Sequence, residues 1–188
     1  MKIKRTFDLW FSFLALISLA IPMALICLLI KLDSKGPIIY WSKRIGQNKT
    51  IFLMPKFRTM LINTPQVATH LLNEPDKYVT SLGMILRKYS IDEFPQLVSI
   101  FFGKMTFVGP RPALFNQDDL IKLRESKGID HLRPGITGWA QVNGRDELSI
   151  EEKVTYEREY LERKSFFFDL YIIWLTLKKV ILRDGISH

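Results

Sequence analysis

Two adjacent carboxylates, Asp92 and Glu93, stand in surroundings that suit chemistry on a phosphate. Two adjacent cations, Arg87 and Lys88, precede them, and an apolar run over residues 97–102 predicts a helix shortly after them. The amino end of a helix has unpaired backbone N–H groups and a partial positive charge, so it attracts anions. A carboxylate in such a place should stay ionised and could attack a phosphorus atom.

Two residues could be the N-cap of that helix. Ser90 with Glu93 three residues later fits a capping box, but Pro95 would then lie past the first turn, where its missing N–H matters. With Asp92 as the N-cap, Pro95 falls among the residues whose N–H has no intrahelical partner. We therefore expect the helix to begin after Asp92.

Basic residues in two other segments could hold the charge of a phosphorylated ligand. Lys56 and Arg58 follow a predicted β-hairpin, whose strands are residues 38–41 and 50–54. In an extended segment these two cations would share one face. Arg111 lies between two prolines, which restrict its backbone and suit it to bidentate phosphate recognition.

A long loop over residues 131–145 contains three glycines and a proline. It gathers Gln141, Asn143 and Arg145, which could bind the nucleotide or sugar part of a ligand, because structured loops of this kind often carry function. Asp146-Glu147 directly follows the loop and is the main rival to Asp92-Glu93 as the reactive pair.

Residues 9–30 carry no charge, and a membrane segment needs about 20 apolar residues. Pro22, near the middle of this stretch, should kink or break a helix. Basic residues flank it on both sides: Lys2, Lys4 and Arg5 before, and Lys31, Lys35, Lys43 and Arg44 after. Such flanks favour the cytoplasmic face. Two interpretations stay open, a re-entrant hairpin that leaves by the leaflet it entered and an ordinary kinked span.

The chain as a whole predicts one α+β domain, mostly helical with a small β-hairpin. Helices are expected over residues 81–88, 116–127 and 149–163. A last helix over residues 166–177 is too short to span a membrane, so it would either pack in the core or, as we prefer, lie at the membrane surface as an amphipathic helix. A net charge of +8 favours polyanionic partners such as anionic lipid, nucleic acid or phosphorylated substrates. One cysteine, Cys27, excludes an internal disulfide, and the three scattered histidines form no metal motif.

Four motifs together resemble the bacterial sugar transferases, and in particular the minimal catalytic unit of the monotopic phosphoglycosyl transferases. In chain order they are KFRTM (56–60), DEFPQ (92–96), FVGPRP (107–112) and RPGITGWAQVNGR (133–145). The resemblance extends over nearly the whole chain. It implies an enzyme that moves a sugar-1-phosphate from a UDP-sugar to undecaprenyl phosphate and releases UMP.

The resemblance also implies roles for single residues. Asp92 would be the nucleophile that forms a covalent phosphosugar intermediate, and Glu93 would be the second acid of the dyad. Lys56, Arg87 and Arg111 would contact phosphate. The cofactor would be Mg²⁺, which typically binds one or two carboxylates together with substrate phosphates, here Asp92 and the donor diphosphate.

The same resemblance implies a place at the membrane. Residues 1–35 would form a re-entrant membrane helix, and residues 36–188 a catalytic part that faces the cytoplasm at the inner leaflet of the bacterial cytoplasmic membrane. The family breaks this helix at a Ser-Pro pair, whereas this chain has Ile21-Pro22, so Ser18 or another group would supply the hydrogen bond of the missing serine. Nucleic acid is not an expected partner, and the sequence gives neither the sugar nor the oligomeric state.

Two other functions remain as alternatives. A metal-dependent glycosyltransferase would move the sugar alone, but many such enzymes use an Asp-x-Asp triplet, which the sequence lacks. A non-catalytic basic membrane adaptor would bind lipid or nucleic acid, with strong dependence on salt. Loops that combine restrained Arg, Gly and Pro residues exceed what such an adaptor needs.

Overall fold

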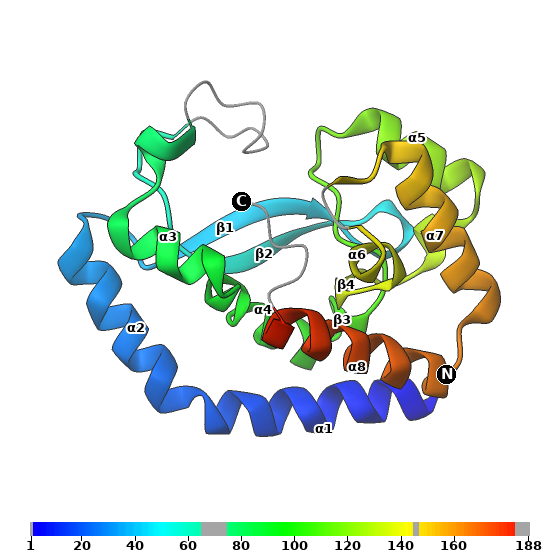
Figure 1. Cartoon of the computed structure of the whole chain (residues 1–188), viewed down its shortest axis with the longest axis horizontal. Coiled ribbons are helices and arrows are strands. Elements are labelled where there is room, and N and C mark those ends of the chain that lie inside the picture. Colours follow the sequence, from blue (N-terminus) through cyan, green and yellow to red (C-terminus); the bar gives the residue numbers. More distant parts are fainter. Residues whose placement is uncertain (1, 65–74, 145–146, 183–188) are drawn as a thin grey trace.

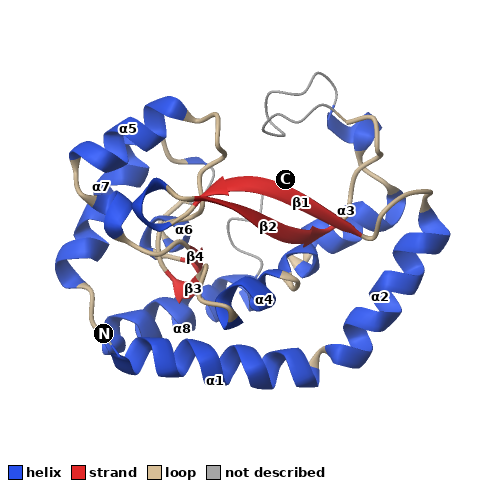
Figure 2. Cartoon of the chain, turned by 180° about the vertical axis from the view of Figure 1, so that it is seen from behind, coloured by secondary structure: helices blue, strands red, loops and turns tan. Residues whose placement is uncertain are grey.

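The structure is a computed structural model that describes residues 2–64, 75–144 and 147–182. The fold is α+β and mostly helical, as the sequence predicts, with two small sheets of two strands each (Figure 2). Its elements, with 3₁₀ helices written η, are α1 (Lys2–Ser18), α2 (Ala20–Asp33), β1 (Ile39–Ile45), η1 (Gln47–Lys49), β2 (Ile51–Phe57), η3 (Pro75–Tyr78), α3 (Ser81–Lys88), η4 (Ile91–Glu93), α4 (Gln96–Phe101), β3 (Thr106–Val108), α5 (Asp118–Ser126), η5 (Ile129–His131), β4 (Gly135–Thr137), α6 (Trp139–Val142), α7 (Ile150–Arg163) and α8 (Phe166–Leu182).

Helices α1 and α2 form one long arm, bent by 60° at Leu19, that runs along one edge of the molecule (Figure 1). The bend lies next to the break that Pro22 predicts. Pro22 is the third residue of α2, where a missing N–H leaves no helical hydrogen bond unmade. The hydroxyl of Ser18 donates to the carbonyl of Ala15 at 3.1 Å. Within the described residues no single helix is long and apolar enough to cross a membrane, but this bent pair taken together is.

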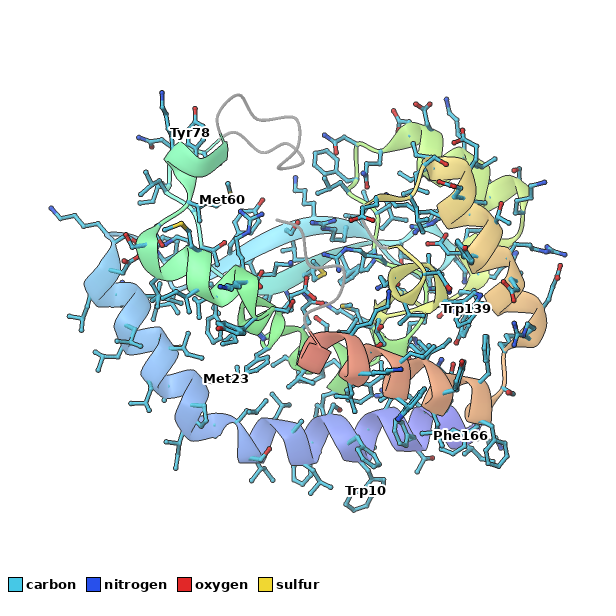
Figure 3. All side chains as sticks on the ribbon, viewed as in Figure 1. Trp10, Met23, Met60, Tyr78, Trp139 and Phe166 are labelled. Carbon is cyan, nitrogen blue, oxygen red and sulfur yellow. The ribbon has the colours of Figure 1, made fainter. Side chains whose placement is uncertain are left out.

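The outer side of the arm is apolar and exposed. Trp10 is 59% exposed and points away from the rest of the molecule (Figure 3). Ile21, Leu25 and Leu32 on α2 are also more than half exposed, as is Phe167 at the start of α8. Exposed apolar side chains in this number on one arm indicate an interaction with something other than water.

Buried polar contacts fix α1 to the rest of the molecule. The Lys4 ammonium lies 2.8 Å from the carboxylate of Asp169 on α8, and Asp8 accepts a hydrogen bond of 2.7 Å from the hydroxyl of Thr106 on β3. Arg5 donates to two backbone carbonyls at the end of α4. Because buried polar groups are costly when unpaired, these contacts hold α1 in one position.

The predicted hairpin is present but longer than expected, with β1 and β2 antiparallel from Ile39↔Phe57 to Ile45↔Ile51. Successive side chains of a strand point to opposite faces. Phe52 and Met54 of β2 therefore both face a core cluster shared with α4, and Lys56 continues this alternation. The strand thus directs the Lys56 side chain toward the segment just before α4.

A second sheet joins residues 106–108 to a partner that lies in the stretch expected to be a loop, residues 131–145. Strands β3 and β4 run parallel, with Thr106 opposite Gly135 and Val108 opposite Thr137. A Cβ on Gly135 would lie 2.2 Å from the backbone nitrogen of Gly109, so only glycine allows this approach. The glycine-rich loop therefore packs directly against the segment that leads to Arg111.

Helices α5 and α7 pack against each other beside this part of the fold (Figure 1). Helix α7, expected over residues 149–163, begins with a capping box between Ser149 and Glu152. Leu120 of α5 and Val154 of α7 share a buried cluster with Ala113, two residues after Arg111.

Candidate active site

The acid pair lies in a short 3₁₀ turn and not at the start of an α-helix. Ser90, in the left-handed conformation (φ 53°), precedes η4, and α4 begins only at Gln96 with Pro95 as its cap residue. Both predicted helix starts are therefore wrong, and no side chain caps either helix. The N–H of Glu93 donates to the carbonyl of Ser90 at 3.2 Å, so backbone donors expected for a phosphate are partly used within the turn.

The structure brings the dyad and three of the predicted basic residues together. Lys56 Nζ lies 2.7 Å from Glu93 Oε1 and 3.4 Å from Asp92 Oδ2. Arg111 Nη2 donates to the same Glu93 Oε1 at 3.1 Å. Arg87, in the last turn of α3, is close enough to lower the pKa of Asp92. Segments far apart in the sequence thus build one compact cluster of two acids and three cations.

Burial determines the acidity of Asp92, which is 8% exposed. Loss of hydration raises the pKa of its carboxyl group above the ordinary value, and the nearby Glu93 raises it further. Lys56 and Arg87 lower the pKa but do not compensate fully. We expected the surroundings to favour the ionised form, and the net effect has the opposite sign because burial outweighs the cations.

Lys56 and Arg58 do not share a face directed at one ligand. Arg58 is 6% exposed and donates to the carbonyls of Lys35 and Ser34, at 2.6 and 2.7 Å, and to the hydroxyl of Ser34. These contacts tie the end of α2 to β2. The expected shared face is wrong because Arg58 lies just past the end of β2, where the carbonyls that follow α2 bind its guanidinium group. We therefore leave Arg58 out of the proposed phosphate site.

Arg44 lies beside the site, although from the sequence we expected it only as a charge flanking the membrane segment. Its Nε donates to the hydroxyl of Ser42 at 2.9 Å and its Nη1 to the carbonyl of Pro112 at 3.1 Å. Burial is the main reason that the pKa of Arg44 is lowered to about 10, and repulsion from Arg111 adds to it. Attraction to Glu93 opposes this shift. One feature of the sequence could have indicated this position. Arg44 lies two residues after Ser42, so in strand β1 both side chains point to the same, inward face.

The polar residues of the glycine-rich loop are engaged with their own backbone. The Gln141 amide donates to the carbonyl of Ile136 at 3.1 Å, and the Asn143 amide to the carbonyl of Trp139 at 2.7 Å. The Gln141 Oε1 atom is buried without a hydrogen-bond partner. Arg145 and Asp146 lie outside the described residues.

The dyad offers oxygen ligands of the kind that magnesium prefers. No group of three or more His, Cys, Asp or Glu side chains in the described part of the chain could hold a metal ion. Lys56 contacts one oxygen of Asp92 and one of Glu93. Since Mg²⁺ commonly uses one or two carboxylates and completes its shell with phosphate and water, the dyad fits an ion that arrives with a phosphorylated ligand.

Comparison with known proteins gives consistent results. A profile described as "Bacterial sugar transferase" matches residues 1–183. The chain is 36% identical to "Exopolysaccharide production protein ExoY" of Sinorhizobium fredii, over 97% of this chain and 87% of that protein.

Longer relatives share the same region. The "Undecaprenyl-phosphate glucose phosphotransferase" of Komagataeibacter xylinus is 38% identical over 95% of this chain and 36% of its own length. The "UDP-glucose:undecaprenyl-phosphate glucose-1-phosphate transferase" of Escherichia coli is 35% identical over 94% and 40%. The chain therefore belongs to the bacterial sugar transferase family and is an enzyme, as its four motifs predict.

Proposed function

We propose that this protein transfers a sugar-1-phosphate from a UDP-sugar to undecaprenyl phosphate, giving undecaprenyl-diphosphate-sugar and UMP. Family membership and the names of the longer relatives support this reaction. The observation that carries the proposal is the buried carboxylate of Asp92 beside Lys56, within a cluster that also contains Arg87 and Arg111.

The reaction proceeds in two displacements at one phosphorus atom. An Asp92 oxygen attacks the sugar-bearing phosphorus of the donor, the bond from that phosphorus to the bridging oxygen breaks, and UMP leaves with this oxygen and its electron pair. A phosphosugar anhydride remains on Asp92. An oxygen of undecaprenyl phosphate then attacks the same phosphorus, and cleavage of the bond to Asp92 restores the carboxylate. Covalent catalysis of this kind replaces one difficult step by two easier ones.

The basic residues stabilise the negative charge that the donor brings and that the leaving UMP develops. Lys56 and Arg111 both contact Glu93 Oε1, so Glu93 holds two cations in place next to the nucleophile. Asp92 would hold Mg²⁺ together with the donor diphosphate, and the ion would add positive charge that neutralises the phosphates.

We place residues 1–35 in the membrane as a re-entrant segment and residues 36–188 on the cytoplasmic face as one catalytic domain. Both ends of the bent arm contact the same body, which supports this placement. Lys4 pairs with Asp169 at the start of α1, and Asp33 at the end of α2 accepts a contact of 3.4 Å from the backbone of Leu82. Two ends held by one body lie on one side of a bilayer.

Labelling of single cysteines at positions 2 and 43 tests this placement. Both Lys2→Cys and Lys43→Cys should react with an impermeant reagent from the cytoplasmic side. Reaction from opposite faces would instead mean an ordinary kinked span.

Intact-mass analysis tests the chemistry. Protein mixed with UDP-glucose or UDP-galactose and Mg²⁺, without lipid, should gain one hexosyl phosphate and release one equivalent of UMP. Asp92→Asn should gain nothing, whereas Asp118→Asn, which changes an exposed aspartate of α5, should behave like the parent protein. Release of UDP would show transfer of the sugar alone. Donor consumption only in the presence of lipid acceptor, with no adduct at any time, would refute the covalent route.

A further inference from the structure

The backbone around Arg111 is held through its carbonyl groups. The carbonyls of Pro110–Pro112 accept, in order, from the backbone N–H of Gly135 at 2.9 Å, from Arg124 Nη2 at 2.9 Å and from Arg44 Nη1 at 3.1 Å. Two of these three residues are prolines and have no N–H to donate, so the carbonyls are the groups through which the segment can be fixed. Each of the three carbonyls has a donor from a different part of the fold.

Arg124 joins this segment to a buried acid on another helix. Its Nε donates to Glu157 Oε2 at 2.7 Å and its Nη2 to Glu157 Oε1, while the second hydrogen of Nη2 serves the Arg111 carbonyl. Arg124 is 9% exposed and Glu157 is 3% exposed. A buried ion pair adds little net stability over well-packed apolar residues, so stability alone does not account for this pair.

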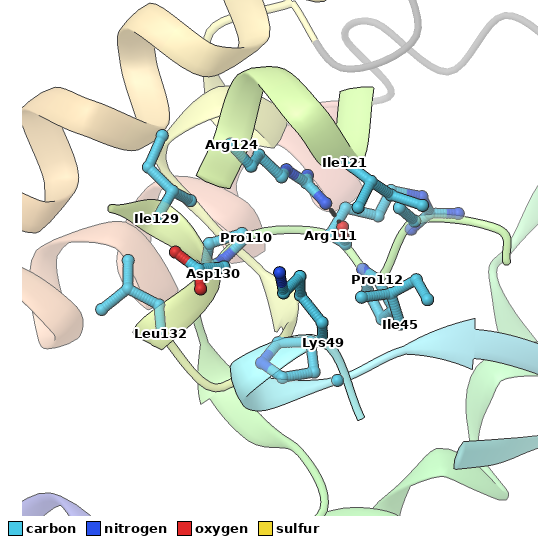
Figure 4. A pocket seen from close by; sticks show the side chains of 13 residues that line it. Ile45, Lys49, Pro110, Arg111, Pro112, Ile121, Arg124, Ile129, Asp130 and Leu132 are labelled. Atoms are coloured by element: carbon cyan, nitrogen blue, oxygen red, sulfur yellow. Dashed lines mark hydrogen bonds between the residues drawn. The ribbon is translucent and has the colours of Figure 1, made fainter. Parts of the chain in front are cut away.

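Packing around the segment is incomplete on this side. Pro110, Arg111 and Pro112 line a cavity of about 30 Å³ that Arg124 also borders (Figure 4). Atoms that line a pocket have fewer protein neighbours, so the hydrogen bonds to the three carbonyls contribute to the position of the backbone there. The planar guanidinium suits this task because Glu157 fixes its orientation through two parallel bonds.

We infer that Arg124 and Glu157 are positioning residues that aim the Arg111 guanidinium at the reacting phosphate. The inference rests on the proposed function for the role of Arg111, but the contact between Arg124 and the Arg111 backbone does not. A misplacement of about 1 Å can lower the rate about 100-fold, so a residue outside the site can control turnover in this way.

Hydrogen–deuterium exchange tests the structural part without any need for activity. Arg124→Lys keeps the positive charge but loses the planar guanidinium group that bonds Glu157 and the Arg111 carbonyl together. Arg124→Leu/Glu157→Leu removes the pair without leaving a buried charge unpaired. Both proteins should exchange faster in peptides covering residues 105–117 and at Gly135, with exchange in α1 unchanged. Arg158→Lys is the matched control, because Arg158 also bonds a glutamate and a carbonyl but at the surface and away from Arg111. Unchanged exchange at residues 105–117 in both variants would overturn the inference.

A double-mutant cycle tests the functional part through UMP release. Arg124→Lys should lower kcat/KM about 10- to 100-fold in the parent protein, but by less than about threefold when Arg111 is already alanine, since the two changes then affect one interaction. Full additivity would mean that Arg124 acts on the fold at large and would overturn the inference. A parent protein that releases no UMP at all would refute the proposed function instead, and the exchange experiment would still decide the contact.

Discussion

Lys56 is the residue whose replacement tests the site most directly, because its ammonium group contacts both acids. Lys56→Met keeps most of the side-chain volume and removes the charge. It leaves Asp92 and Glu93 adjacent and largely buried, with Arg111 still 3.1 Å from Glu93. Two changes should follow, a loss of stability and a further rise in the pKa of Asp92, since Lys56 is the group that lowers this pKa most.

The distances give the size of the stability change. At an effective dielectric constant of about 20, attraction over the observed 2.7 and 3.4 Å amounts to about 6 and about 5 kcal/mol before desolvation. Dehydration of the charges offsets most of this, and breaking a buried pair costs about 3–5 kcal/mol in measured cases. The lower end applies because the side chain of Lys56 is 17% exposed. In a chain of this length about 3 kcal/mol corresponds to a decrease of about 6–12 °C in Tm.

Thermal unfolding in detergent and the pH dependence of UMP release measure the two changes. Lys56→Met should melt lower, and its rate should fall at a higher pH than that of the parent protein as the medium is acidified. The double variant Lys56→Met/Glu93→Gln should lose about 1–3 kcal/mol less free energy of unfolding than the two single variants together, because neighbouring charges couple. Lys122→Met, at an exposed lysine of α5, is the control. Equal Tm values for Lys56→Met and Lys122→Met, with strict additivity in the cycle, would refute this reasoning.

Other measurements address Asp92, Arg44 and Lys4. Asp92 attacks in its ionised form and burial raises its pKa, so kcat/KM should fall as the pH decreases, with a midpoint above the usual aspartate pKa of about 4. A midpoint at that usual value would contradict the burial argument. The raised pKa also means that ionised Asp92 destabilises the folded state at neutral pH. Asp92→Asn should therefore melt higher at pH 7, with a gain that disappears below the unfolded pKa, and an equal gain at all pH values would speak against this linkage. Arg44→Lys loses the bond to Pro112 and should lower kcat/KM about tenfold without a large change in Tm, and unchanged kinetics would remove Arg44 from the site. Lys4→Met leaves Asp169 buried without its cation and should lower Tm by about 6–12 °C, whereas Lys2→Met, at an exposed residue of the same helix, should not.

The sequence determined those features that depend on neighbours along the chain. Alternating apolar residues and the turn at residues 46–49 predict the hairpin, and Ser149 with Glu152 predicts the start of α7. Pro22 predicts the bend of the N-terminal arm to within a few residues. The motif around Asp92 identifies the reactive stretch and the family, because residue types at short spacing are all that such a motif requires.

The tertiary structure decided every feature in which one group acts on another from a distant segment. Lys56 and Arg58 are two residues apart, yet one contacts the acids and the other ties down α2, because the strand ends between them. Arg44 appeared only as a flanking charge until β1 placed it beside Arg111. The pKa of Asp92 shifts in the opposite direction from the one we expected, because its carboxyl group is buried. That burial depends on how α3 and β2 pack around the turn, which the neighbouring residues in the sequence do not determine.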